Sequence, residues 1–130
     1  PPRPDVEPTV LVAPGSTAVP WARGRITVDD GQGVGFDEVV DRDRLAFPLT
    51  VRAAMPGERF DPLGMSGRRQ RVVEFLRLRR VPRGLRASVP VVADREGIVW
   101  IVGHRIADRA RTRESTSRRL GLSWLSDDPV

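Results

Sequence analysis

The sequence predicts an α+β domain with a largely antiparallel sheet and one main helix. Three observations support this prediction. The chain has 130 residues, of which 39% are hydrophobic and 30% charged, and this size and composition suit a single domain with one core. Short runs of β-type residues recur between turn signals along most of the chain. One segment, residues 68–80, has the length and composition of a helix.

The N-terminal part is predicted to contain a linker and two strands. Residues 1–8 include four prolines, which keep the backbone extended, and we interpret them as a proline-rich linker. Residues 9–13 read TVLVA, a short β-type run that Pro14 and Gly15 end. Residues 21–28 alternate well enough in polarity to predict a second strand before an Asp-rich turn.

Two further strands are expected before the helix, over residues 36–40 and 49–53, with a turn signal at residues 55–57. The glycine-rich segment 31–35 superficially resembles a dinucleotide-binding loop. However, no helix pattern follows it, and its third glycine is misplaced for the G-x-G-x-x-G motif. We therefore interpret this segment as a hairpin loop.

Residues 68–80 are predicted to form the helix because they contain no Gly or Pro, and because Pro82 follows their end. At about 100° per residue they have an apolar stripe and a polar face. The apolar stripe consists of Val72, Phe75 and Leu76, and the opposite face of Gln70, Glu74 and Arg77. The remaining arginines cluster near the two ends of the helix. They could lie along a phosphate backbone or extend past the core into water, and both interpretations stay open.

After the helix, residues 90–93 and 98–102 are predicted to form a hairpin. Their continuous apolar character is typical of central strands that are buried on both faces. Residues 120–125 are expected to form the last strand. The predicted domain therefore spans residues 9–126, and residues 127–130 are expected to form a tail.

The composition excludes several classes of site. The sequence has no Cys and one His, which excludes disulfides, thiolate zinc sites, iron–sulfur clusters and cysteine nucleophiles. All 22 basic residues are Arg, which excludes a lysine Schiff base or a P-loop lysine. His104 and Asp108 are four residues apart, but no G-x-S-x-G turn accompanies them, so a hydrolase triad is disfavoured. We expect no catalytic residue, metal site or cofactor site in this chain.

The sequence also shows no membrane signal. No apolar run approaches the roughly 18–20 residues that cross a bilayer, and the N-terminus lacks the pattern of a signal peptide. We expect a cytoplasmic protein that does not contact a membrane.

The basic residues are concentrated in the second half of the chain. Residues 1–66 contain seven Arg against ten acidic residues, whereas residues 67–130 contain 15 Arg against seven. Arg suits bidentate contact with phosphate, which makes nucleic acid a candidate partner. The alternative is that a GC-rich genome encodes Arg in place of Lys and that many of these charges are merely solvated. The chain has no Tyr, and most of its Phe and Trp occupy core-like positions, so structured RNA is favoured over unpaired bases.

Several separated motifs then occur in a recognisable order. The turn at residues 57–67 reads GERFDPLGMSG and precedes the basic helix, and residues 81–83 read VPR after it. Residues 90–92 (PVV) and 98–106 (IVWIVGHRI) follow. Together these motifs resemble the C-terminal domain of tRNA(Ile)-lysidine synthetase, and the resemblance extends over residues 39–125.

The resemblance implies both a function and partners. The family's enzymes use ATP to join lysine to the wobble cytidine of tRNA(Ile) with a CAU anticodon, through an adenylated intermediate. ATP and lysine belong to an N-terminal catalytic domain that is absent from these residues, so the fragment itself is not expected to be catalytic. The C-terminal domain of the family engages the tRNA acceptor stem and is related in fold to a domain of phenylalanyl-tRNA synthetase. The resemblance therefore implies a bacterial, cytoplasmic tRNA-modifying ligase. The expected partners are tRNA(Ile), the protein's own catalytic domain and a second copy of the parent enzyme.

The clustering of arginines and the resemblance together indicate the site residues. The predicted tRNA-binding residues are Arg68, Arg69, Arg71, Arg79, Arg80, Arg83, Arg86 and Arg105. Gln70 and Arg71 stand where the family usually has two adjacent lysines. Two arginines match the basic pair before Val-Pro, two match basic positions after it, and Arg105 matches the one that follows the Trp-containing strand.

The chain departs from the family pattern at two places. Glu58 stands where Asp is usual, and Arg77 and Leu78 stand where an apolar residue and an acid are usual. The second departure bears on which arginines of the helix reach RNA. A rival interpretation is a protein-interaction module that packs on the catalytic domain or on a second subunit, with its arginines paired to acids there.

Overall fold

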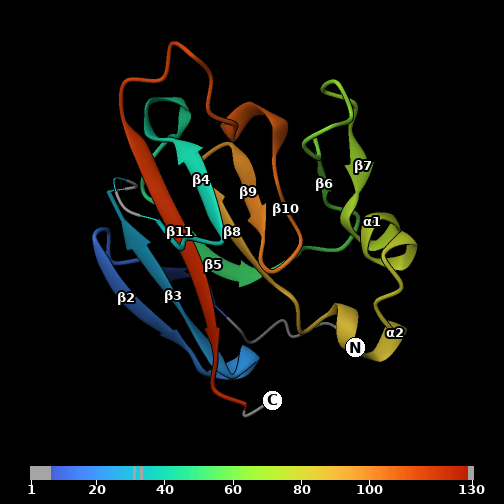
Figure 1. Ribbon diagram of the computed structural model, residues 1–130. Helices are drawn as coiled ribbons and strands as arrows, with labels where there is room; N and C mark the ends of the chain where they lie inside the picture. The colour runs from blue at the N-terminus through green and yellow to red at the C-terminus, as the bar shows by residue number, and fades with distance from the viewer. Residues whose placement is uncertain (1–6, 31, 33, 129–130) are drawn as a thin grey trace.

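The computed structural model describes residues 7–30, 32 and 34–128 and consists of two antiparallel sheets with a small helical layer (Figure 1). Most of the predicted linker, two positions of the 31–35 loop and the end of the predicted tail lie outside the described residues. No helix in the described part of the chain is long and apolar enough to cross a membrane.

All strand pairings are antiparallel. The five-stranded sheet has the order β1 (Thr9–Val10), β5 (Thr50–Ala53), β8 (Pro90–Asp94), β9 (Gly97–Ile101) and β10 (Arg105–Ile106). The four-stranded sheet has the order β2 (Gly15–Val19), β3 (Gly24–Asp29), β11 (Arg119–Ser126) and β4 (Glu38–Asp41). A two-stranded hairpin pairs β6 (Arg59–Phe60) with β7 (Gln70–Arg71). The helices are α1 (Val72–Leu78) and α2 (Arg83–Arg86). The predicted α+β class, with mostly antiparallel sheets and one main helix, is confirmed.

The main core lies between the two larger sheets. Side chains such as Ile26 and Leu122 of the four-stranded sheet pack there with Val92 and Trp100 of the five-stranded sheet. The register shift opposite Val99 is a β-bulge that puts two consecutive residues of β9 into this core. The predicted hairpin corresponds to β8 and β9, which are interior strands of the five-stranded sheet and are almost entirely buried, as predicted.

A second core lies on the other face of the five-stranded sheet. Alternate residues of its central strands, among them Val91 and Ile101, pack against Phe75 and Leu76 of α1 and against Phe60. The rings of Phe60 and Phe75 meet edge to face, with their centroids 5.2 Å apart. This packing holds α1 and the β6–β7 hairpin against the five-stranded sheet, and α2 lies on the same side of the molecule (Figure 1).

The helix is shorter than predicted. The predicted apolar stripe is buried, but residues 68–71 are not helical, and their assignment to the helix is wrong. Gln70 and Arg71 pair with β6 instead, and the N–H of Val72 donates to the carbonyl of Glu58 (2.9 Å). The helix ends at Leu78, after which Arg80 adopts a left-handed backbone with φ 63°. A second short helix, α2, then forms where none was predicted.

The N-terminal strands also differ from the prediction. The first strand covers only β1, and Gly15 begins β2 where the sequence was interpreted as a break. The strand predicted over residues 21–28 begins at Gly24, because a single 3₁₀ turn occupies Pro20–Ala22. A Cβ at Gly24 would collide with the indole of Trp124, so this position requires glycine to let the two strands approach.

Candidate nucleic-acid interface

The eight arginines predicted to bind tRNA lie on the side of the molecule that carries the helices. Arg68 and Arg69 precede β7, and Arg71 belongs to it. The others follow α1, lie within α2 or begin β10. None of the eight forms an ion pair with an acidic residue in the described part of the chain. Their guanidinium charges are therefore available to a polyanion.

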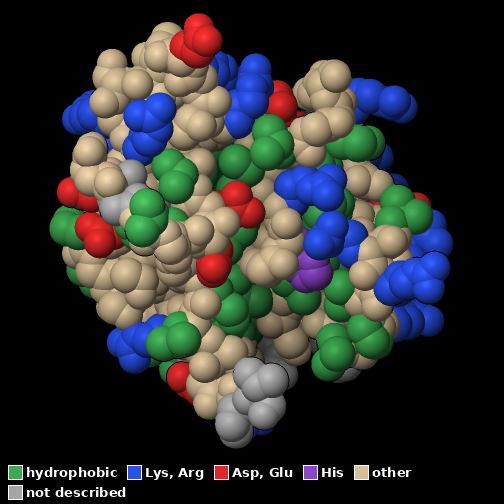
Figure 2. All heavy atoms as spheres, viewed as in Figure 1, with side chains coloured by type: hydrophobic (Ala, Val, Ile, Leu, Met, Phe, Trp, Pro, Cys, Tyr) green, Lys and Arg blue, Asp and Glu red, His purple; other side chains and the backbone are tan. Residues whose placement is uncertain are grey.

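Two of these arginines converge on one aromatic ring. The guanidinium carbons of Arg79 and Arg105 each lie 5.5 Å from the centroid of the Phe75 ring. The imidazole of His104 meets the same ring edge to face, with the centroids 6.3 Å apart. We call these four residues the Phe75 cluster. Figure 2 shows the histidine (purple) among basic side chains (blue) on this part of the surface. Each cation–π contact is worth about 0.5–2 kcal/mol, depending on its exposure to water.

His104 takes part in this cluster as a hydrogen-bond acceptor. Its Nδ1 accepts a hydrogen bond from Nε of Arg79 (2.9 Å). Burial, together with the neighbouring charge of Arg79, lowers the pKa of His104, so the imidazole is neutral near pH 7. The contact between His104 and Arg79 could not be predicted from the sequence, because the two residues are 25 positions apart.

Some of the predicted arginines also have contacts within the fold. Nε of Arg86 donates to the carbonyl of Val81 (3.0 Å), and Arg69 donates to the carbonyl of Arg59 (3.3 Å). These bonds use one donor group each and leave the positive charges without an acidic partner. Arg68, Arg71, Arg80 and Arg83 are exposed.

Arg77, one of the departures from the family pattern, behaves differently. It forms an ion pair with Glu74 one turn earlier in α1, and its hydrogen bond lowers the pKa of the Glu74 carboxyl. The extra arginine is therefore neutralised locally on the exposed side of the helix.

A second group of arginines, near the C-terminus, is engaged within the fold. Arg109, Arg111 and Arg118 form ion pairs with Asp94, Asp108 and Asp43, respectively. Arg113 donates to the carbonyl of Arg111 (3.0 Å). This group mainly stabilises strands and loops. Ion pairing thus distinguishes Arg109, Arg111 and Arg118 from the eight candidate arginines. Arg95, Arg113 and Arg119, outside the candidate set, also form no ion pair in the described part of the chain.

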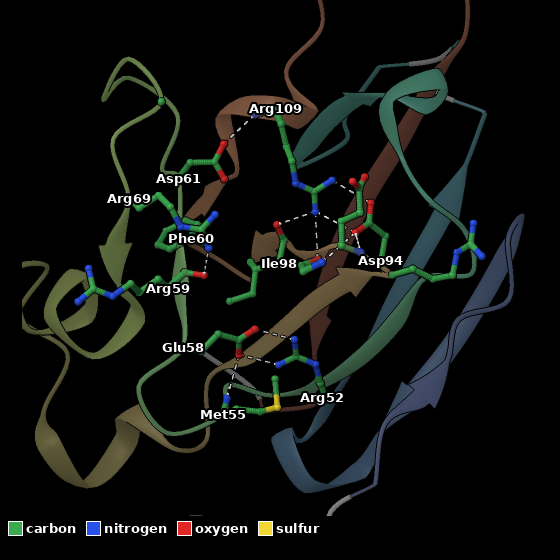
Figure 3. A pocket seen from close by; sticks show the side chains of 14 residues that line it. Arg52, Met55, Glu58, Arg59, Phe60, Asp61, Arg69, Asp94, Ile98 and Arg109 are labelled. Carbon is green, nitrogen blue, oxygen red and sulfur yellow. Dashed lines mark hydrogen bonds and ion pairs between the residues drawn. The ribbon is translucent and has the colours of Figure 1, made fainter.

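The structure also contains a cleft of about 600 Å³, which the sequence analysis did not predict (Figure 3). Its walls come from residues 52–69 and 94–109, and Phe60 and Ile98 contribute apolar surface. Two ion pairs lie in it, one between Arg52 and Glu58 and one between Arg109 and Asp94. Five further charged residues line the cleft and form no ion pair in the described part of the chain: Arg59, Asp61, Arg69, Arg95 and Glu96. No cluster of three or more potential metal ligands is present in the described residues.

Comparison with known proteins agrees with this geometry. Residues 49–124 match the model of the family described as TilS substrate C-terminal domain. The chain belongs to this family. The turn, helix and hairpin that carry the Phe75 cluster all lie within the matched residues, and so do the eight candidate arginines.

The curated relatives of this TilS-family chain include tRNA(Ile)-lysidine synthases. The protein of Caldanaerobacter subterraneus subsp. tengcongensis is 31% identical over 100 residues, which are 77% of this chain and 21% of the relative. That of Dehalococcoides mccartyi is 37% identical over 85 residues, which are 65% of this chain and 18% of the relative. The chain therefore spans about a fifth of the length of these curated relatives.

Two solved structures share the fold. The crystal structure of a TilS C-terminal domain superposes with a TM-score of 0.80 at 22% identity, covering 95% of this chain and 99% of that one. An N-terminal fragment of the phenylalanyl-tRNA synthetase β-subunit from Pyrococcus horikoshii gives a TM-score of 0.55 at 16% identity, covering 79% of this chain and 29% of that one. The fold relationship expected from the sequence is thereby confirmed.

Proposed function

We propose that this TilS-family domain binds the acceptor stem of tRNA(Ile) and orients it while a separate domain of the same protein modifies the anticodon. The observation that carries this proposal is the set of eight arginines without acidic partners on the helical side of the molecule. Like charges that lie close together repel each other, and no acidic residue offsets this repulsion here. Binding to a phosphate backbone would relieve it.

The aromatic residues favour a duplex over single-stranded RNA. Phe75, at the centre of the basic cluster, is 4% exposed, and Phe60 and Trp100 are also buried. None of these three rings presents a free face on which a base could stack. Guanidinium groups around a buried ring instead suit contact with phosphate oxygens, whose positions follow from the shape of an A-form helix.

The reaction of the parent protein is part of the same proposal. Lysine and ATP would be bound by another domain, as the resemblance to tRNA(Ile)-lysidine synthetase implies. We assign no ATP site to this chain, because its sequence has no lysine for a P-loop and its glycine-rich segment 31–35 lacks the spacing of a dinucleotide-binding loop.

The test is the affinity of this chain for its tRNA(Ile) and for an unrelated tRNA at several salt concentrations. Each phosphate contact contributes about 0.9 to the slope of log K against log salt. Changing both Arg79 and Arg80 to Ala should therefore flatten the slope by about two units. It should weaken the binding of the two tRNAs equally. As a control, Arg23→Ala with Arg118→Ala removes the same charge from exposed ion pairs elsewhere and should leave the slope unchanged. Equal effects of the two double variants would refute the proposed surface.

One observation favours a second candidate function, packing against the protein's own catalytic domain. Val73, Leu78 and Leu85 are 52%, 60% and 58% exposed, and they lie on α1 and α2, next to unpaired arginines that follow α1 or belong to α2. Exposed apolar residues of this size are typical of contact surfaces between proteins. This function is supported if the chain binds neither tRNA at low salt.

A further inference from the structure

We propose that His104 is a positioning residue that holds the guanidinium of Arg79 so that it binds an RNA backbone phosphate together with Arg105. This inference rests on the proposed tRNA-binding function and names the contact that prepares the site. It follows from the hydrogen bond between the two side chains, from the ring that supports them and from the backbone turn that fixes the imidazole.

The side chain of Arg79 is fixed at two points. Its guanidinium lies over Phe75, and its Nε donates to Nδ1 of His104. An arginine has five N–H donors, and this bond uses the one on Nε. The four donors of Nη1 and Nη2 have no partner in the described part of the chain. Arg79 can therefore contact a phosphate through Nη1 and Nη2. Its Nε–H is not available to the phosphate, because it is already bonded to His104.

Arg105 supplies the second charge of the site. Arg105 lies in the edge strand β10, where it pairs with Ile101. Its guanidinium carbon, like that of Arg79, is 5.5 Å from the centroid of the Phe75 ring. None of its side-chain donors is bonded to another described residue. Two guanidinium groups supported by one ring repel each other unless an anion neutralises them. A phosphate, or two neighbouring phosphates of one strand, has the charge and size to do so.

The imidazole is itself held in place. His104 lies in the tight turn between β9 and β10, where Gly103 has φ 80° and the N–H of His104 donates to the carbonyl of Ile101 (2.9 Å). The charged groups around it are Arg79 at the end of α1 and its neighbour Arg105. Burial and the charge of Asp37 raise the pKa of the Glu38 carboxyl in β4, and the nearby charge of Arg105 offsets part of this rise. Burial and the Arg79 charge keep the imidazole neutral, so that Nδ1 remains an acceptor.

The decisive experiment compares two amides at position 104. In His104→Asn the side-chain Oδ1 takes the place of Nδ1 and can accept from Arg79. In His104→Gln the carbonyl lies one atom further out, near the place of Nε2. We expect Gln to weaken tRNA binding about twofold to tenfold, the cost of immobilising a free arginine on the ligand. We expect Asn to bind as the wild type does.

Variants of Arg79 and Arg105 distinguish the positioning role of His104 from the proposed tRNA-binding function. Arg79→Ala should weaken binding, and His104→Gln should add nothing in the Arg79→Ala background. If Arg79→Ala weakens binding but His104→Gln does not, the positioning role is refuted while the proposed function stands. If neither Arg79→Ala nor Arg105→Ala weakens binding, both are refuted at this site. Equal losses in the Asn and Gln variants, with unchanged thermal unfolding, also overturn the positioning role.

Discussion

Replacing Asp94 by Ala should destabilise the domain more than any other change to a single ion pair. The side chain of Asp94 has no exposed surface and accepts two hydrogen bonds from Arg109, each 2.9 Å long. It also accepts from the backbone N–H groups of Ala46, Glu96 and Gly97. The carboxylate thereby joins the loop before β5, the β8–β9 turn and the chain after β10.

The expected cost follows from what the substitution leaves behind. Arg109, 27% exposed, would keep its charge but lose its only acidic partner among the described residues. The N–H of Ala46 would lose its acceptor as well. Removing one member of a buried ion pair costs about 3–5 kcal/mol. For a domain of this size, that lowers the melting temperature by about 10–20 °C.

Urea unfolding followed by circular dichroism measures the free energy of unfolding directly. The matched control is Asp43→Ala, because Asp43 pairs with Arg118 at an exposed site and should cost at most about 1 kcal/mol. A loss below about 1 kcal/mol for Asp94→Ala, or equal losses for the two variants, would refute the reasoning.

The same carboxylate predicts a pH dependence. Burial alone would raise the pKa of Asp94, but the hydrogen bonds from Arg109, Ala46 and Glu96 outweigh it and lower the pKa. The folded pKa lies below the unfolded value of 3.8, so the stabilisation is complete above that value. It is lost as the pH falls towards the folded pKa. The wild type should therefore lose stability in acid faster than Asp94→Ala does.

Two further predictions concern an ion pair and the packing at a glycine, and the second has a control variant. Glu58→Asp should cost about 1–3 kcal/mol in urea unfolding, because the Glu58 carboxylate accepts two bonds from Arg52 (2.8 and 2.7 Å) that a shorter side chain cannot both keep; an unchanged midpoint would contradict this. Gly121→Ala should cost about 1–3 kcal/mol, because its Cβ would lie 2.6 Å from the ring of Phe36. Gly84→Ala, in a helix with open space around it, should be neutral or stabilising by up to about 1 kcal/mol, and equal melting temperatures for these two variants would disprove the packing argument.

The sequence predicted best those elements that local pattern determines. The hairpin of β8 and β9 is visible as two apolar runs around a turn, and its predicted limits differ from the observed ones by one residue. The start of the helix could not be predicted in this way. Residues 68–71 are good helix formers, but Gln70 and Arg71 pair with β6, a contact made by tertiary structure that overrides local preference.

The same distinction applies to the candidate site. The sequence shows how many arginines there are, and their clustering together with the resemblance selects eight of them. It does not show that Arg109 pairs with an acid 15 residues away while Arg105 pairs with none. The role of His104 depends on a partner 25 residues earlier, at the end of a helix whose last residue the sequence did not locate.

The position of β11 has a consequence for how the protein is made. This last strand lies between β3 and β4, and it pairs with residues far earlier in the sequence, such as Gly121 with Asp29 and Leu120 with Val40. Without it, β4 has no neighbour in its sheet, and β3 has only the edge strand β2. During translation the four-stranded sheet therefore stays incomplete until residues 119–126 have left the ribosome. Until then, strand edges and the apolar surface of the main core remain open to chaperones and to other nascent chains.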